Sequence, residues 1–415
     1  MQTSHDEKKY GCGIRFLQGL AILLVITVLV MTGYAAGIAT MWRFGYEIRA
    51  AVANLVPESA GQPIPERIPE EDFDLLDKVW GILGREFHDP DSLDEQKMIY
   101  GAAMGLASSL EDPYTMFVEP MRAAILADDM QGSFEGIGAT VSMLDGQLIV
   151  VEPLPNSPAL EAGIQAGDVI LAVDDEPLEG KSYFEAIALI RGPRGTVVRL
   201  LVKREGTADL FTVPVTRGEV EVPIVEARIT EEGIAYLRLR EFNALSENRV
   251  HSALDELLQA DPIGLILDLR DNPGGFLEMS VAIASEFLPE DTLVVSQKER
   301  DKPLEQFRVE HVGIATEIPL VVLIDGSSAS ASEIVAGAIR DHQRGVLIGE
   351  QTFGKGSVQS VHALEDGSSL RVTVAKWYLP NGDNLDSNGI QPDIEVVLTP
   401  DDAIQGKDPQ LDRAI

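Results

Sequence analysis

The sequence predicts a multidomain α/β protein, α+β in its domain arrangement, behind an N-terminal transmembrane helix. A chain of 415 residues is long enough for two or three domains, and its 45% of hydrophobic residues can fill their cores. Short apolar runs typical of buried strands alternate with runs of helical spacing in its second half. A nearly continuous apolar run covers residues 16–42.

The run 16–42 predicts a membrane anchor, because it exceeds the ~20 residues that span a bilayer. A cleaved signal peptide usually has an apolar region of only ~7–15 residues, but Ala35-Ala36-Gly37 leaves cleavage open as an alternative. Basic residues are more frequent before the run than after it, which places residues 1–15 in the cytoplasm. We therefore expect a single-pass protein of the cell membrane, with the part that follows the anchor on the periplasmic or extracellular side.

A proline-rich linker, residues 43–68, follows the anchor. Residues 69–127 then form a predicted helical region. Its first helix covers 70–85, where Phe73, Leu76 and Val79 recur with helical spacing, and its second covers 93–110.

Residues 128–217 read as a small domain of strands with one helix at 181–191. Gly136, Ile137, Gly138 and Ala139 begin it, and their backbone N–H groups are suited to bind the terminal carboxylate of a peptide that adds as a strand beside 139–143. Two isoleucines of the helix share one face and are candidates to line a side-chain pocket, although they would serve equally well as plain core: Ile187 and Ile190. In this order of elements the segment resembles a PDZ domain.

Residues 218–398 read as the main α/β domain, and 399–415 as a C-terminal tail. The predicted strands are 234–239, 264–270, 321–324 and 346–349, and the predicted helices are 248–260 and 334–341. The second strand runs into the turn Asp271-Asn-Pro-Gly-Gly275, which without further information is a simple Pro-Gly turn.

Ser330 is the candidate nucleophile. The sequence Ser327-Ser-Ala-Ser-Ala-Ser-Glu333 follows a strand and a tight turn and precedes a helix. This order places the Ser330 hydroxyl near the first helical turn, where backbone N–H groups lack partners and can bind the negative oxygen of a tetrahedral intermediate.

Lys355 is the candidate general base. It stands between Gly354 and Gly356, so another chain can pass close to it, and burial would lower its pKa toward neutrality. The residues after it alternate like a strand, which would place positions 355, 357 and 359 on one face. Gln359 could then hold the lysine amine by a hydrogen bond.

Other interpretations remain open at this point. A serine run before a helix is commonly only an N-cap, and a lysine between glycines is commonly a solvated turn residue. The segment Gly349–Lys355 matches a phosphate-binding loop, but Gly356 stands where serine or threonine should bind magnesium. His362 could relay protons in place of the lysine. A PDZ scaffold without catalysis is the alternative of another class.

Two motifs carry a family resemblance: Gly326-Ser-Ser-Ala-Ser-Ala-Ser-Glu-Ile-Val-Ala-Gly-Ala-Ile339 and Gly354-Lys-Gly-Ser-Val-Gln359. With them the chain resembles the C-terminal processing peptidases, or tail-specific proteases, over residues 72–415. The resemblance implies a serine endopeptidase with Ser330 as nucleophile, Lys355 as base and Gln359 in support. It also implies an oxyanion hole in which the backbone N–H of Gly274 or Gly275 joins that of Ala331.

Composition limits the partners. A formal charge of −34 disfavours nucleic acid and anionic lipid surfaces as ligands. The six histidines show no H-E-x-x-H spacing, so we expect no catalytic zinc and no other cofactor. The expected partners are proteins or peptides with apolar C-terminal tails, and the membrane through the N-terminal helix. The sequence leaves open whether the protein acts as a homo-oligomer or with an adaptor protein.

Overall fold

The computed structural model describes residues 70–386 and 388–415, and it divides the chain into two compact units, residues 1–93 and 94–415. The predicted anchor at 16–42 and the linker at 43–68 lie outside the described residues. Within 70–386 and 388–415, no helix combines the length and apolarity needed to cross a membrane. In the first unit the described elements are helix α2 (Glu70–Glu86), as the apolar spacing predicts, and a 3₁₀ turn (Pro90–Ser92).

The second unit begins with α3 (Glu95–Ser108), which confirms the second predicted helix, and α4 (Pro120–Gln131). The region expected to be helical also contains a strand, β1 (Met116–Val118). It pairs with residues 369–371 of the C-terminal half, so this segment belongs to a sheet of the main domain. Three residues are too short for a periodic signal, which explains why the sequence did not predict the strand.

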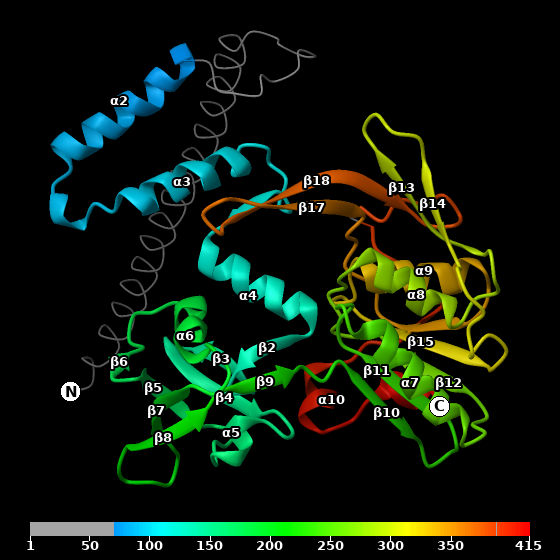
Figure 1. Cartoon of the computed structure of the whole chain (residues 1–415). Helices are drawn as coiled ribbons and strands as arrows, with labels where there is room; N and C mark the ends of the chain where they lie inside the picture. Colours follow the sequence, from blue (N-terminus) through cyan, green and yellow to red (C-terminus); the bar gives the residue numbers. More distant parts are fainter. Residues whose placement is uncertain (1–69, 387) are drawn as a thin grey trace, which may run out of the picture. The chain divides into compact units, whose positions relative to one another are not determined.

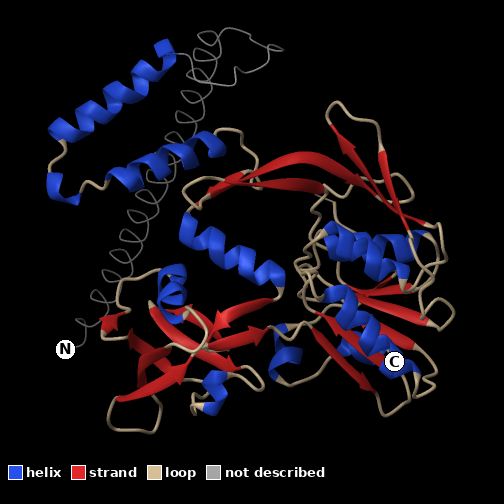
Figure 2. Ribbon diagram, viewed as in Figure 1, coloured by secondary structure: helices blue, strands red, loops and turns tan. Residues whose placement is uncertain are grey.

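The segment that resembles a PDZ domain is a sheet with two short helices (Figures 1 and 2). Its strands, in the order β3-β4-β5-β7-β8 with β6 beside β5, are β3 (Ala139–Leu144), β4 (Gln147–Pro153), β5 (Val169–Val173), β6 (Glu176–Pro177), β7 (Val197–Lys203) and β8 (Phe211–Thr216). Its helices are α5 (Pro158–Glu161) and α6 (Tyr183–Ile190). Along β7 buried and exposed side chains alternate, and Val198, Leu200 and Val202 enter the core. Strand β3 lies at an edge of the sheet.

A two-stranded ribbon, β2 (Ser133–Gly136) with β9 (Gly218–Glu221), flanks this segment. The main domain then has a six-stranded sheet in the order β10-β11-β12-β15-β16-β19. Its strands are β10 (Val225–Ile229), β11 (Ala235–Leu239), β12 (Leu265–Asp268), β15 (Leu320–Ile324), β16 (Val346–Gly349) and β19 (Ile394–Glu395). All neighbouring pairs are parallel except β10 with β11.

Helices cover both faces of this sheet because its strands are buried on both sides. Leu237, Leu267 and Val322 pack in the larger core with α7 (Ser246–Leu258), α8 (Leu277–Ser285) and α9 (Ala331–Asp341). The alternate residues Tyr236, Ile266, Leu323 and Ile348 pack against Leu411 and Ala414 of α11 (Pro409–Ala414), which follows the short helix α10 (Pro400–Ile404).

The remaining sheet contains β13 (Leu293–Glu299), β14 (Glu305–Arg308), β17 (Ser357–Ala363) and β18 (Ser369–Tyr378), with β1 at its edge. Strand β17 starts at Ser357 and has an irregularity between Val358 and Gln359. Lys355 lies two residues before this strand, and the pairing of β17 with β18 shifts register before Gln359. Lys355, Ser357 and Gln359 nevertheless line one cavity, in agreement with the expectation that they share a face.

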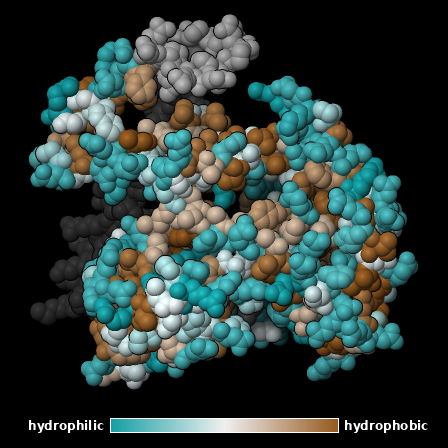
Figure 3. All heavy atoms as spheres, viewed as in Figure 1, coloured by the Kyte–Doolittle hydropathy of each residue, from teal (hydrophilic) through white to brown (hydrophobic). Residues whose placement is uncertain are grey.

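The topology brings two loops together. Strands β12 and β15 are parallel neighbours, so their carboxyl ends lie at the same edge of the sheet. The loop after β12 carries Asp271–Gly275, and the loop after β15 carries Ser327–Ser330. On the face shown in Figure 3, hydrophilic residues cover much of the described surface with apolar residues interspersed, as expected for a highly charged chain.

Candidate active site

Ser330 is the residue at which strand β15 and its turn pass into helix α9. Its backbone has φ 55° and ψ −113°, a conformation that costs a non-glycine residue roughly 1–3 kcal/mol. The turn is fixed on both sides, because the Ser330 N–H donates to Glu333 Oε2 (2.8 Å) and the Ala329 N–H donates to the Asn272 carbonyl (3.0 Å). A sharp strand-to-helix turn of this kind presents a hydroxyl beside a helix N-terminus.

Lys355 lies in a partly buried environment beside this turn. Gly354 before it has φ +90°, and a Cβ there would come within 2.8 Å of the Gly389 nitrogen, so the loop requires glycine. The Lys355 Nζ lies 5.0 Å from the centre of the Tyr114 ring. Burial lowers the pKa of Lys355, and the positive charge of Arg371 lowers it further; Glu333 and Asp112 act in the opposite direction but do not cancel the shift.

One buried carboxylate, Glu333, connects the two candidate residues. Its oxygens accept from the N–H of Ser330 (2.8 Å), Gly354 (2.7 Å) and Lys355 (3.0 Å) and from Thr352 Oγ1 (2.6 Å). Its side chain is fully buried. Glu333 therefore holds the backbone of both loops with the same functional group. This role of Glu333 was not predicted, although a glutamate three residues after an N-cap serine is the ordinary sequence signal for such a contact.

The turn after β12 packs against Ser330. Gly274 has φ +96°, and a Cβ there would lie 2.8 Å from the Ser330 Cβ and 2.9 Å from the Ala331 nitrogen. The Gly274 N–H donates to Asn272 Oδ1 (2.9 Å), and the Asn272 carbonyl also accepts from Ser332 Oγ (2.9 Å). Gly274 is buried, whereas Gly275 is exposed. Only glycine allows position 274 to lie this close to Ser330 and Ala331. The Gly274 N–H is already used in its hydrogen bond to Asn272.

A cavity of about 690 Å³ brings most of the candidate residues together. Its wall includes Gly274, Gly275, Ser330, Lys355 and Gln359. Ala331 is almost fully buried at the start of α9 and is not among the lining residues. Apolar side chains complete the wall: Leu126, Met130, Phe276, Leu277, Val358, Val361 and Trp377. Among the described residues, no histidine lines this cavity, and His362 is exposed, so the structure offers no support for the histidine relay.

Gln359 is oriented by neighbours on β17 and β18. Its Nε2 donates to Ser357 Oγ (3.0 Å) and to Thr373 Oγ1 (3.1 Å). Both amide hydrogens are thereby used, which leaves the carbonyl oxygen as the acceptor of this side chain. The hydrogen bond expected between Gln359 and the Lys355 amine stays a prediction.

A second cavity, of about 280 Å³, lies in the segment that resembles a PDZ domain. Ile137, Gly138, Ala139, Ile187 and Ile190 line it, whereas Gly136 does not. Both isoleucines are also largely buried, and Ile190 belongs to the core, so the alternative that they fill the interior holds in part. Asp129 and Glu241 line both cavities, and therefore the two cavities adjoin.

Charged side chains surround the junction. Arg191 pairs with Asp129 (2.6 Å) and lies over the Phe134 ring, 4.2 Å from its centre. Burial, followed by the negative charge of Asp129, raises the pKa of Glu241. The described residues contain no cluster of histidine, cysteine and acidic side chains suited to hold a metal ion.

Comparisons with known proteins identify the family. Residues 233–396 match the model of peptidase family S41, and residues 149–204 match the PDZ domain. The chain is 36% identical to the carboxy-terminal-processing protease of Bartonella bacilliformis over 73% of this chain and 70% of that protein. It is 34% identical to the carboxy-terminal processing protease CtpA of Bacillus subtilis over 79% of this chain and 69% of that protein.

A third relative is the carboxyl-terminal-processing protease of Synechocystis, 38% identical over 77% of this chain and 76% of that protein. Both family models fall on the segments that carry the two cavities. The chain therefore belongs to peptidase family S41, and it is a serine-type, carboxy-terminal processing protease with a PDZ domain.

Proposed function

We propose that this protein is a membrane-tethered endopeptidase that uses Ser330 as its nucleophile and Lys355 as its general base, and that it acts on proteins selected by their C-terminal tails. One observation carries the proposal. The Glu333 carboxylate accepts from the N–H groups of both Ser330 (2.8 Å) and Lys355 (3.0 Å), beside a cavity that both side chains line.

The reaction begins with the neutral amine of Lys355, which takes the proton from Ser330 Oγ as this oxygen attacks the scissile carbonyl carbon. Lys355 then gives that proton to the leaving amine nitrogen, and the C–N bond breaks to leave an ester on Ser330. A water molecule then attacks the ester carbonyl, and Lys355 takes a proton from this water. The bond to Ser330 Oγ breaks, Lys355 returns the proton to that oxygen, and the acid product leaves. The side-chain carbonyl oxygen of Gln359 orients the Lys355 amine by accepting a hydrogen bond from it.

The tetrahedral oxygen binds the backbone N–H groups of Ala331 and Gly275 in this proposal. Ala331 begins helix α9, where N–H groups have no acceptor within the helix. Gly275 is preferred to Gly274 because the Gly274 N–H donates to Asn272 Oδ1 (2.9 Å). Exposure of Gly275 on the cavity wall agrees with this assignment.

The substrate tail binds in the PDZ cavity. Strand β3 is an edge strand, so an extended peptide can pair with it, while the N–H groups of Ile137 to Ala139 receive the terminal carboxylate. An apolar last side chain fits between Ile187 and Ile190. Because the two cavities share Asp129 and Glu241, a bound tail leads toward the catalytic cavity.

The test uses the purified full-length chain and an unstructured peptide that ends in apolar residues, with a free or an amidated C-terminus. We expect the enzyme to cleave the peptide with the free C-terminus at an internal bond. For the amidated peptide we expect a KM higher by roughly 10–100-fold and an unchanged kcat. The loss of one charge-assisted hydrogen bond, worth about 1.5–3 kcal/mol, gives this magnitude. A peptide with an acidic last residue serves as the control. Equal cleavage of all three peptides would exclude tail recognition, and tail binding without cleavage would support a scaffold.

Tethering through residues 16–42 is tested separately. We expect the mature protein to keep its N-terminal segment and to fractionate with membranes, since the apolar run exceeds the length of a signal-peptide core. The mass of the mature N-terminus decides this, because cleavage after Gly37 would remove the anchor.

Arg371 makes the pH dependence of the reaction testable. Its positive charge lowers the pKa of Lys355, second only to burial. In Arg371→Gln that pKa rises, so the acid limb of the kcat/KM profile moves to higher pH and activity at pH 7 falls by roughly several-fold. The alkaline plateau stays unchanged, because the neutral lysine is the same base. Lys376→Gln on the same strand, an exposed residue paired with Asp386 (2.8 Å), is the control. If the pH profile of kcat/KM in Arg371→Gln is the same as in the wild type, Lys355 is not the general base.

A further inference from the structure

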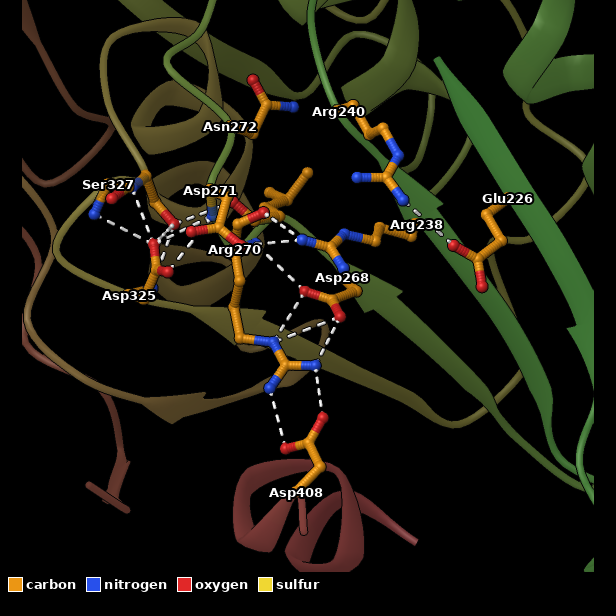
Figure 4. A network of polar contacts seen from close by, with 12 residues as sticks. Glu226, Arg238, Arg240, Asp268, Arg270, Asp271, Asn272, Asp325, Ser327 and Asp408 are labelled. Carbon is orange, nitrogen blue, oxygen red and sulfur yellow. Dashed lines mark hydrogen bonds and ion pairs between the residues drawn. The ribbon is translucent and has the colours of Figure 1, made fainter. Parts of the chain in front are cut away.

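Residues 408–410 make partly buried polar contacts with Arg270, which lies just before the turn that carries Gly274 and Gly275. Asp408 is the N-cap of helix α11, and its carboxylate accepts two hydrogen bonds from the Arg270 guanidinium, both of 2.8 Å (Figure 4). Gln410 Oε1 accepts a third, from Nη1 of Arg270 (3.0 Å). These residues are 138 and 140 positions apart in the chain from Arg270.

The other side of the same guanidinium is held by Asp268 at the end of strand β12. Nε and Nη2 of Arg270 donate to this fully buried carboxylate at 3.0 and 2.7 Å, and the Tyr236 hydroxyl donates to it at 2.7 Å. Arg270 itself is 7% exposed. A guanidinium this far from water requires an acceptor for each of its N–H groups, because a buried donor that loses its acceptor carries the full cost of its desolvation.

Asp408 is present as the carboxylate that this arrangement needs. Burial alone would raise the pKa of Asp408, but the hydrogen bonds from Arg270 and from the Leu411 N–H outweigh burial and lower it. Gln410 is almost fully buried, and its Nε2 donates to the Val396 carbonyl (2.8 Å). The end of the chain is therefore fixed at Arg270 by directed polar contacts as well as by the packing of Leu411 and Ala414 on the sheet.

Arg270 is the residue immediately before the turn. Its own N–H donates to Asp268 Oδ1 (3.0 Å), and the next N–H, that of Asp271, donates to Asp325 Oδ1 (3.1 Å). Asp325 also accepts from the N–H groups of Ser327 and Ser328 (both 3.0 Å), so it joins this turn to the loop that carries Ser330. From Asp408 to Gly275, each step is a hydrogen bond or a neighbour in sequence, as Figure 4 shows for its first part.

We propose that Asp408, with Gln410, is a positioning residue for catalysis: the C-terminal segment fixes Arg270 and thereby the turn whose Gly275 N–H stabilises the tetrahedral oxygen. This inference rests on the proposed function of that N–H. It assigns a role in the reaction to a segment that the sequence indicates only as a tail.

The experiment compares Asp408→Asn with Asp408→Glu and with Asp412→Asn in the full-length chain. Asp412 lies exposed on the same helix, so its variant controls for a change of charge there. The first readout is hydrogen exchange of the amides at 271–277, which needs no catalysis. The second is kcat and KM for the tail peptide described above.

We expect Asp408→Asn to speed exchange at 271–277 and to lower kcat roughly 10–100-fold, less than the complete loss of an oxyanion donor, with KM within about twofold. Asp408→Glu should recover part of kcat, and Asp412→Asn should match the wild type. In a double-mutant cycle with Arg270→Lys, the variant that carries both Asp408→Asn and Arg270→Lys should have nearly the same kcat as Arg270→Lys alone, because Asp408 acts through Arg270.

Hydrogen exchange at 271–277 that is the same in Asp408→Asn as in the wild type would overturn the proposal. Additive losses of kcat in the double-mutant cycle would also overturn it. Faster exchange spread over the entire sheet would show a purely structural role. If Asp408→Asn does not fold, Gln410→Leu removes one acceptor and keeps the ion pair, and the same local exchange and a smaller loss of kcat are expected. Absence of cleavage by the wild type would contradict the proposed function, while the exchange data would still decide whether Asp408 positions the turn.

Discussion

Ser330→Ala and Lys355→Ala are each expected to lower kcat/KM by roughly 10⁴-fold or more, with little change in tail binding. Ser330 is the proposed nucleophile, and Lys355 is the proposed base beside it, with a pKa lowered by burial and by Arg371. The two variants should be equally inactive, and the double variant should lose no more than either single one, because the residues act as a unit.

Two further substitutions sharpen this test. Lys355→Arg keeps a long basic side chain but cannot lose its proton and so cannot act as a base; it should be as inactive as Lys355→Ala. His362→Ala should match the wild type. Cleavage is followed by mass spectrometry of both fragments, and tail binding by fluorescence of a labelled peptide. Substantial activity in Lys355→Arg would exclude lysine as the base, and inactivity of His362→Ala would restore the histidine relay.

Glu333→Gln is expected to lower kcat roughly 10²–10³-fold and the free energy of unfolding by about 3 kcal/mol. The carboxylate accepts from three backbone N–H groups and one hydroxyl, all within 3.0 Å. Glutamine replaces one acceptor by an NH₂ group that faces N–H donors, so buried donors on the Ser330 and Lys355 loops lose their partner. Both loops then move away from the geometry that the reaction requires.

The pH profile separates this positioning role from a simple electrostatic one. Glu333 raises the pKa of Lys355, so in Glu333→Gln that pKa falls and the acid limb of kcat/KM moves to lower pH. More of the base is then neutral at pH 7, yet kcat on the plateau should still be reduced. Glu278→Gln, an exposed residue on the same cavity wall, is the control. A Glu333→Gln enzyme with the plateau of the wild type would show that the carboxylate does not position the site.

Local signals in the sequence predicted most elements of the fold. The apolar spacing that predicted helices at 70–85 and 93–110 is confirmed as α2 and α3, and the helix expected at 334–341 is α9, which begins three residues earlier. The serine run explains that difference, since a helix can start directly after its N-cap. Strand β1 and the irregularity in β17 were not predicted, because both depend on pairing with β18 rather than on a local pattern.

The sequence indicates candidate residues for the site but not the contacts that hold them in place. Ser330, Lys355 and Gln359 lie within motifs, whereas the role of Glu333 depends on backbone N–H groups that are 21 and 22 residues away. The pairing of Arg270 with Asp408 spans 138 residues and follows from tertiary structure alone. The engaged N–H of Gly274, which distinguishes it from Gly275, depends on a side chain in the same turn whose direction no sequence pattern gives.

Helix α11 has a consequence for the binding of substrates. In the proposed mode of recognition, a substrate segment must be extended to pair with strand β3. Residues 409–414 are helical instead, and the Ile415 N–H donates to the Leu411 carbonyl (3.0 Å). A helical segment cannot pair as a strand with β3, so residues 409–415 do not compete with substrates for that edge as long as this helix stays docked.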